Sequence, residues 1–193
     1  MLHLLEPTPA SWAPAAAADL RGLLLDHAHC ELKAASSALA LVGRFGSDAP
    51  VLIEPLAELA REETAHFRQV HSKIEARGAQ LGKPTPDEYV GALMKAARQD
   101  EPKQPILLAR LVVSALIEAR SCERFKLLAG ELGEGELGDF YRGLMAAEAR
   151  HFRLFCDLAE AVFGAEGRRR LRVLAEREAS VAAQLPLGPT VHG

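Results

Sequence analysis

The chain has 193 residues, 49% of them hydrophobic, which is enough for one well-packed domain and too few to make two domains expected. Its formal net charge of −3 excludes a global electrostatic attraction to nucleic acid or to an anionic membrane. A polyanionic partner would therefore need a local basic surface. Aromatic residues are only 5% of the composition, whereas alanine and leucine are abundant, which favours helices.

The N-terminal segment lacks the features of a secretory leader. Prolines interrupt it and no lysine or arginine precedes Arg21, so we expect no signal peptide. No apolar run approaches the roughly 20 residues of a membrane span. The three cysteines are far apart and form no C-x-x-C motif, which predicts no disulfide partner. We expect a cytoplasmic protein that does not bind membranes.

Helical periodicity predicts five helices in a single domain spanning residues 1–193. The expected helices cover residues of about 14–45, 50–77, 105–130, 136–163 and 166–184. Gly78 is expected to end the second of these helices. A long crossover connection follows it, with a short amphipathic piece near Tyr89 to Arg98, and a glycine-rich turn separates the third helix from the fourth.

The fourth expected helix carries an E-x-x-H motif in the middle of its apolar stripe. That stripe, at intervals of three or four residues, is Leu137, Tyr141, Leu144, Glu148, His151, Phe155, Leu158 and Val162. The second helix repeats the arrangement, with Glu63 and His66 on an apolar face. That face also contains Leu52, Leu56, Leu59, Val70 and Ile74. Each of these two helices thus carries a Glu–His pair at positions where the periodicity predicts apolar side chains.

The first and third helices each carry one central carboxylate on their apolar faces, Glu31 and Glu118. Glu31 precedes Glu63 by 32 residues and Glu118 precedes Glu148 by 30, so the two halves of the chain follow the same plan. Each half is a helical hairpin that supplies a Glu and then an E-x-x-H. Two such hairpins joined by a crossover predict an all-α, ferritin-like four-helix bundle with an extra C-terminal helix.

Buried carboxylates are too costly to keep unless they are protonated, paired or bound to metal. Four carboxylates would be neutralised by two divalent cations if the histidines are neutral, and carboxylate with imidazole suits iron or manganese. The predicted metal ligands are Glu31, Glu63, His66, Glu118, Glu148 and His151. The alternative is a bundle without metal, in which the four carboxylates need other partners.

Several neighbouring residues compete for these roles. Glu58, Glu62 and Glu123 lie in the same helices, but Glu123 is five positions beyond Glu118 and so points away from its face. We interpret His27, one turn before Glu31, as a core or surface residue rather than as a partner of that carboxylate.

Four segments carry a resemblance to a known family. They are Asp26–Ser36 (DHAHCELKAAS), Leu59–His66 (LAREETAH), Ile117–Phe125 (IEARSCERF) and Glu148–His151 (EARH). Together they resemble the tRNA hydroxylase family called MiaE, and the EARSCERF run is the most specific piece. The resemblance extends over all five expected helices, in order and with similar spacings.

The resemblance implies a non-haem di-iron monooxygenase that hydroxylates the isopentenyl side chain of a hypermodified adenosine in tRNA. It places the six predicted ligands on the family's iron-binding positions. The implied cofactor is a pair of Fe ions, with O2 as co-substrate and manganese as the less favoured metal. The two electrons needed per turnover imply an external reductase or electron carrier as a partner, in addition to tRNA.

Other functions use the same predicted fold. A ferritin-like iron-binding protein would store many irons, and a manganese-catalase or rubrerythrin-type protein would handle peroxide.

The candidate basic surface for tRNA binding combines the last expected helix with the outer face of the fourth. Its residues are Arg142, Arg150, Arg153, Arg168, Arg169, Arg170 and Arg172. The same arginines could equally form a solvated helix face, and the sequence does not decide between the two.

Overall fold

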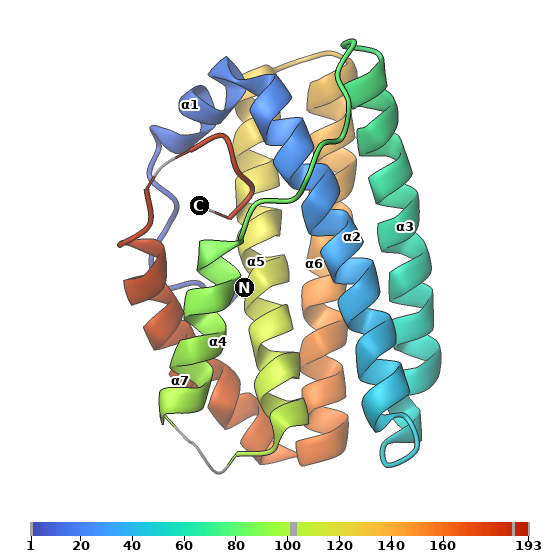
Figure 1. The fold of residues 1–193 in the computed structure, drawn as a ribbon. Coiled ribbons are helices and arrows are strands. Elements are labelled where there is room, and N and C mark those ends of the chain that lie inside the picture. Colours follow the sequence, from blue (N-terminus) through green and yellow to red (C-terminus); the bar gives the residue numbers. More distant parts are fainter. Residues whose placement is uncertain (1, 101–103, 187, 193) are drawn as a thin grey trace. The chain divides into compact units, whose positions relative to one another are not determined.

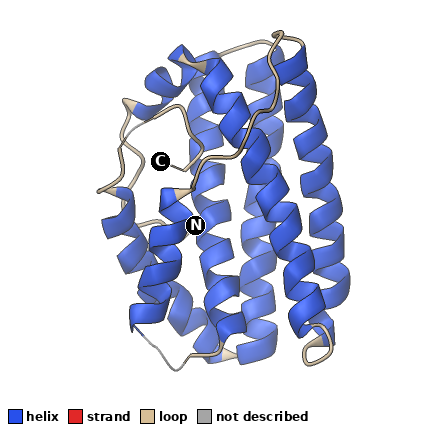
Figure 2. Cartoon of the chain, in the orientation of Figure 1, coloured by secondary structure: helices blue, strands red, loops and turns tan. Residues whose placement is uncertain are grey.

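The computed structural model describes residues 2–100, 104–186 and 188–192, and all regular structure in these ranges is helical (Figure 2). The all-α class is therefore confirmed. The elements are α1 (Trp12–Ala18), α2 (Leu20–Phe45), the 3-10 turn η1 (Pro50–Leu52), α3 (Ile53–Glu75), α4 (Glu88–Asp100), α5 (Ile106–Leu132), α6 (Glu136–Phe163) and α7 (Ala165–Ala182). In the described ranges, no helix is both long and apolar enough to cross a membrane.

The chain divides into two compact units. Unit 1 comprises residues 1–14, 87–187 and 192–193, and unit 2 comprises residues 15–86 and 188–191. The single domain spanning residues 1–193 stays a prediction.

Unit 2 is built on the hairpin of α2 and α3, whose helices run side by side (Figure 1). The sequence predicted one helix from about residue 14 to 45, but the structure interrupts it at Asp19. The Asp19 carboxylate accepts a hydrogen bond from the Gly22 amide at 2.9 Å, so it caps a new helix instead of continuing the old one. After α3, Gly78 has a φ of +67°, the left-handed conformation that glycine adopts without strain.

Unit 1 is built on the longer hairpin of α5 and α6, against which α7 also packs (Figure 1). The turn between α5 and α6 contains Gly133 and Gly135 with φ values of +69° and +135°, which explains its glycine-rich sequence. Gly167 lets α7 approach α6 closely, because a Cβ there would lie 2.5 Å from the Ala159 carbonyl oxygen.

The short amphipathic piece expected near Tyr89 to Arg98 is α4, which packs against α5 and α7. The predicted crossover connection also includes residues 101–103, which lie outside the described residues.

A buried polar network connects these helices within unit 1. Arg120 of α5 donates from Nη2 to Glu178 Oε1 of α7 at 2.7 Å, and Tyr89 of α4 donates to the same oxygen at 2.9 Å. Arg120 Nη1 also donates to Thr8 Oγ1 at 3.0 Å, which attaches the N-terminal segment to α5. Arg120 and Glu178 are 1% and 0% exposed, so a fully desolvated ion pair fastens α5 to α7.

Candidate metal centre

Unit 2 brings three of the predicted ligands together. Glu31 comes from α2, whereas Glu63 and His66 come from successive turns of α3. His66 Nδ1 lies 3.0 Å from Glu63 Oε2 and 3.7 Å from Glu31 Oε2. One candidate ligand atom from each residue lies within 4.8 Å of the others, so we call these residues the unit 2 cluster. Helical geometry accounts for the contact, because residues i and i+3 share a helix face.

The unit 2 cluster concentrates negative charge in a buried place. Burial alone would raise the pKa of the Glu31 carboxyl, but hydrogen bonds with His27 and His66 outweigh it and hold that pKa well below its ordinary value. Burial lowers the pKa of His66, yet Glu31 and Glu63 raise it to about 10. Positive charge is therefore drawn to this cluster, as a site for a divalent cation requires.

His27 corrects one interpretation from the sequence. It is buried, but its Nε2 lies 2.7 Å from Glu31 Oε1, so it is a direct partner of the candidate ligand. The signal was present, because the two residues are four positions apart on one helix face. A hydrogen bond of this kind fixes the orientation of a ligating carboxylate.

Unit 1 contains the matching arrangement. Glu118 lies on α5, and Glu148 and His151 lie one helical turn apart on α6. His151 Nδ1 is 3.8 Å from Glu148 Oε1 and 4.0 Å from Glu118 Oε2. All three residues are buried, and one candidate ligand atom from each lies within 4.8 Å of the others. We call them the unit 1 cluster.

The donor set of both clusters fits a divalent metal ion. Each cluster offers two carboxylates and one imidazole, with the oxygen and nitrogen donors that iron and manganese accept. Both clusters lie on long helices rather than on loops, so their side chains start from rigid backbone. The sequence thus located each of the two groups, and the prediction that their members bind metal stays a prediction.

Two of the three competing glutamates, Glu58 and Glu123, have other partners. Glu123 accepts hydrogen bonds from the backbone N–H and the hydroxyl of Thr8, and it pairs with Arg120. Glu58 pairs with Arg61 on an exposed part of α3. Neither carboxylate belongs to a cluster.

The arginines near the C-terminus do not form one continuous basic face. Arg170 is 0% exposed and donates from Nε to Gln104 Oε1 at 2.9 Å, so it is a core residue. Arg168 pairs with Glu160, and Arg169 pairs with Glu166. Arg172 is exposed. Periodicity alone gave no warning of the burial of Arg170, because its partner Gln104 lies 66 residues away.

Comparison with known proteins places this chain in a family. All residues, 1–193, match the family described as tRNA-(MS[2]IO[6]A)-hydroxylase (MiaE). A tRNA 2-(methylsulfanyl)-N(6)-isopentenyladenosine(37) hydroxylase of Pseudomonas putida is 45% identical over 153 residues, which cover 79% of this chain and 73% of that protein. A Salmonella typhimurium protein of the same name is 33% identical over 223 aligned positions, which cover 91% of this chain and 82% of that protein.

A solved structure supports the fold assignment. The chain resembles a Synechococcus protein with aldehyde deformylating oxygenase activity, with a TM-score of 0.86 and 40% identity. The match covers 98% of this chain and 95% of that one. The predicted ferritin-like fold is therefore confirmed.

Proposed function

This chain belongs to the MiaE family of tRNA hydroxylases, and on that basis we propose that it hydroxylates the isopentenyl side chain of a hypermodified adenosine in tRNA. The observation that carries the proposal is the full-length family match, with relatives named for this reaction at up to 45% identity. The two Glu, Glu, His clusters supply side chains suited to the chemistry.

We propose iron as the metal, two ions per chain, with Glu31, Glu63, His66, Glu118, Glu148 and His151 as ligands. The charges balance, since two divalent cations neutralise four carboxylates. When bound, the iron pair would activate O2 and supply the oxidant that a C–H bond requires. Manganese accepts the same donors, and metal analysis distinguishes the two.

His27 and the burial of the carboxylates would support metal binding at the two clusters. His27 donates to Glu31 and keeps its carboxylate oriented, which supports metal affinity. Glu63 and Glu148, 1% and 4% exposed, hold their negative charge away from bulk water. Low exposure keeps water from competing for the ligands, and it strengthens their attraction for a cation.

Electrons must come from a partner. Inserting one oxygen atom of O2 into a C–H bond and releasing the other as water consumes two electrons and two protons beyond those of the substrate. The sequence has no dinucleotide-binding fingerprint and no cysteine set for an iron–sulfur cluster. We therefore propose an external reductase or electron carrier.

The direct test is hydroxylation of prenylated tRNA by the iron-loaded chain with O2 and a chemical reductant. Nucleoside mass spectrometry should show that the isopentenyl adenosine gains one oxygen atom, and labelled O2 should deliver the label. The matched control is Glu148→Gln under the same conditions. An iron-loaded chain that leaves the nucleoside unchanged but consumes peroxide would contradict the hydroxylase function.

A further inference from the structure

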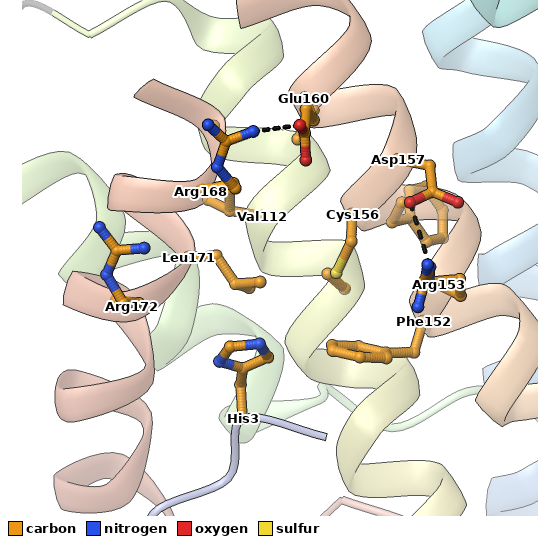
Figure 3. Close-up of a pocket in the computed structure, with 14 residues that line it drawn as sticks. His3, Val112, Phe152, Arg153, Cys156, Asp157, Glu160, Arg168, Leu171 and Arg172 are labelled. Carbon is orange, nitrogen blue, oxygen red and sulfur yellow. Dashed lines mark hydrogen bonds and ion pairs between the residues drawn. The ribbon is translucent and has the colours of Figure 1, made fainter. Parts of the chain in front are cut away.

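Unit 1 holds a cavity of about 240 Å³ among α5, α6, α7 and the N-terminal segment (Figure 3). Apolar side chains from all three helices form its wall, among them Val112, Phe152 and Leu171, together with the thiol of Cys156. None of the six proposed metal ligands lines it. The cavity is therefore a feature separate from both clusters.

Guanidinium groups surround the cavity. Arg153 pairs with Asp157 at 3.2 Å, and Arg168 pairs with Glu160, in exposed positions (Figure 3). Exposed ion pairs of this kind are weak, so a phosphate can compete for these arginines. Arg172, on the same rim, forms no ion pair with any residue in the described part of the chain.

Two aromatic rings stand at the cavity. The rings of His3 and Phe152 have centroids 6.1 Å apart and planes tilted by 42° (Figure 3). His3 has a φ of +60°, an uncommon conformation for a residue with a side chain. The His3 ring is exposed whereas the Phe152 ring is buried, and an exposed ring face is a usual stacking platform for a base of single-stranded RNA.

The size of the cavity limits what can enter it. About 240 Å³ is below the roughly 300–1,000 Å³ of pockets for drug-sized ligands, so a single ring system fits better than a dinucleotide. An apolar wall, aromatic rings and rim arginines together match a base with its phosphate. Arginines from both α6 and α7 line the cavity, so a strand with several phosphates has a guanidinium group on either helix beside the bound base.

We propose that this cavity binds the base of one unstacked nucleotide of the tRNA substrate, with Arg172 contacting its phosphate. The proposal rests on the proposed function, because it takes the substrate RNA as the occupant. It also explains how a chain with a net charge of −3 binds a polyanion, since the contacts are local and the base adds stacking energy.

A coupling experiment between the cavity and the RNA tests the proposal. The probe is an anticodon stem-loop RNA that carries isopentenyl adenosine, together with versions lacking the base at one loop position at a time. Affinity is measured by fluorescence anisotropy for the parent chain and for Cys156→Phe, which fills the cavity. Cys156→Ala, which leaves it open, is the matched control. Cys156 is half-buried, so the larger ring has room to adjust.

Filling the cavity should weaken binding about tenfold, and removing one particular base should do the same, because each change removes the stacking of one base. The two changes combined should weaken binding no more than either alone, and Cys156→Ala should bind as the parent does. Additive losses at every loop position would overturn the proposal while leaving the hydroxylase function standing. If the parent chain does not bind the stem-loop at all, both fail.

A second variant keeps the proposal testable if Cys156→Phe does not fold. Arg172→Gln should lower the slope of log affinity against log salt by about one, as loss of a phosphate contact does. Arg98→Gln, at an exposed position of α4 away from the cavity, should leave the slope unchanged. Equal slopes for both variants and the parent would overturn the phosphate contact.

Adenosine monophosphate is the last probe. If it binds the parent chain, if Cys156→Phe abolishes that binding, and if Cys156→Phe shows no coupling to the RNA bases, the cavity is a site for a free nucleotide and the proposal is wrong.

Discussion

Replacing Glu148 with glutamine is expected to lower the iron content from about two ions per chain to one or fewer and to abolish oxygen-dependent hydroxylation. The amide keeps the size of the side chain but removes the negative charge that a cation needs in a buried place. Glu118→Gln should behave in the same way, because Glu118 belongs to the same cluster. Metal analysis of the anaerobically loaded protein measures the first effect, and nucleoside mass spectrometry measures the second.

Glu123→Gln is the matched control for these variants. Glu123 lies on α5, as Glu118 does, but its carboxylate is engaged by Thr8 and Arg120. We expect this variant to keep its iron, although it should lower thermal stability. Full iron occupancy in both Glu118→Gln and Glu148→Gln would show that the ligand assignment is wrong.

The candidate ligands could be found from the sequence because helical period is a local property. An E-x-x-H pair places both side chains on one face whatever the rest of the chain does, and the structure has His66 3.0 Å from Glu63. Predicting that α2 and α3 form a hairpin needed a second observation, namely that the spacing between the two glutamates is similar in both halves of the chain. In the structure Glu31 Oε2 lies 3.7 Å from His66 Nδ1, and the prediction that both residues bind metal stays a prediction.

Features that depend on distant partners could not be found in this way. A sequence pattern predicts an arginine to be exposed unless its acceptor is known. Arg120 is buried, but its acceptor Glu178 is 58 residues away in the sequence, so no local pattern indicated the burial. The break at Asp19 was missed for another reason, because its capping partner Gly22 is only three residues away and the continuous apolar periodicity masked this local signal. The cavity needed three helices and the N-terminal segment to be placed at once, so no local pattern could have indicated it.

The largest effect on stability is expected from Glu178, which does not belong to either cluster. Its Oε1 accepts hydrogen bonds from Arg120 Nε at 3.0 Å, from Arg120 Nη2 at 2.7 Å and from the Tyr89 hydroxyl at 2.9 Å. Removing it leaves the guanidinium of Arg120 buried without its main counter-charge. The attachment of α7 to α5 and α4 weakens at the same time.

Glu178→Ala should therefore lower the free energy of unfolding by about 3–5 kcal/mol, the usual cost of removing one partner of a buried ion pair, although Arg120 keeps its second carboxylate, Glu123. For a chain of this length that corresponds to a fall of roughly 6–20 °C in the thermal midpoint. Glu176→Ala, at an exposed position on the same helix, should change stability by no more than about 0.5 kcal/mol. Replacing both partners, Arg120→Met with Glu178→Leu, should recover part of the loss, because the charge then left without Arg120 is that of Glu123, which keeps its hydrogen bonds from Thr8. Equal midpoints for Glu178→Ala and Glu176→Ala in thermal denaturation would mean that this ion pair does not hold α7 against α5.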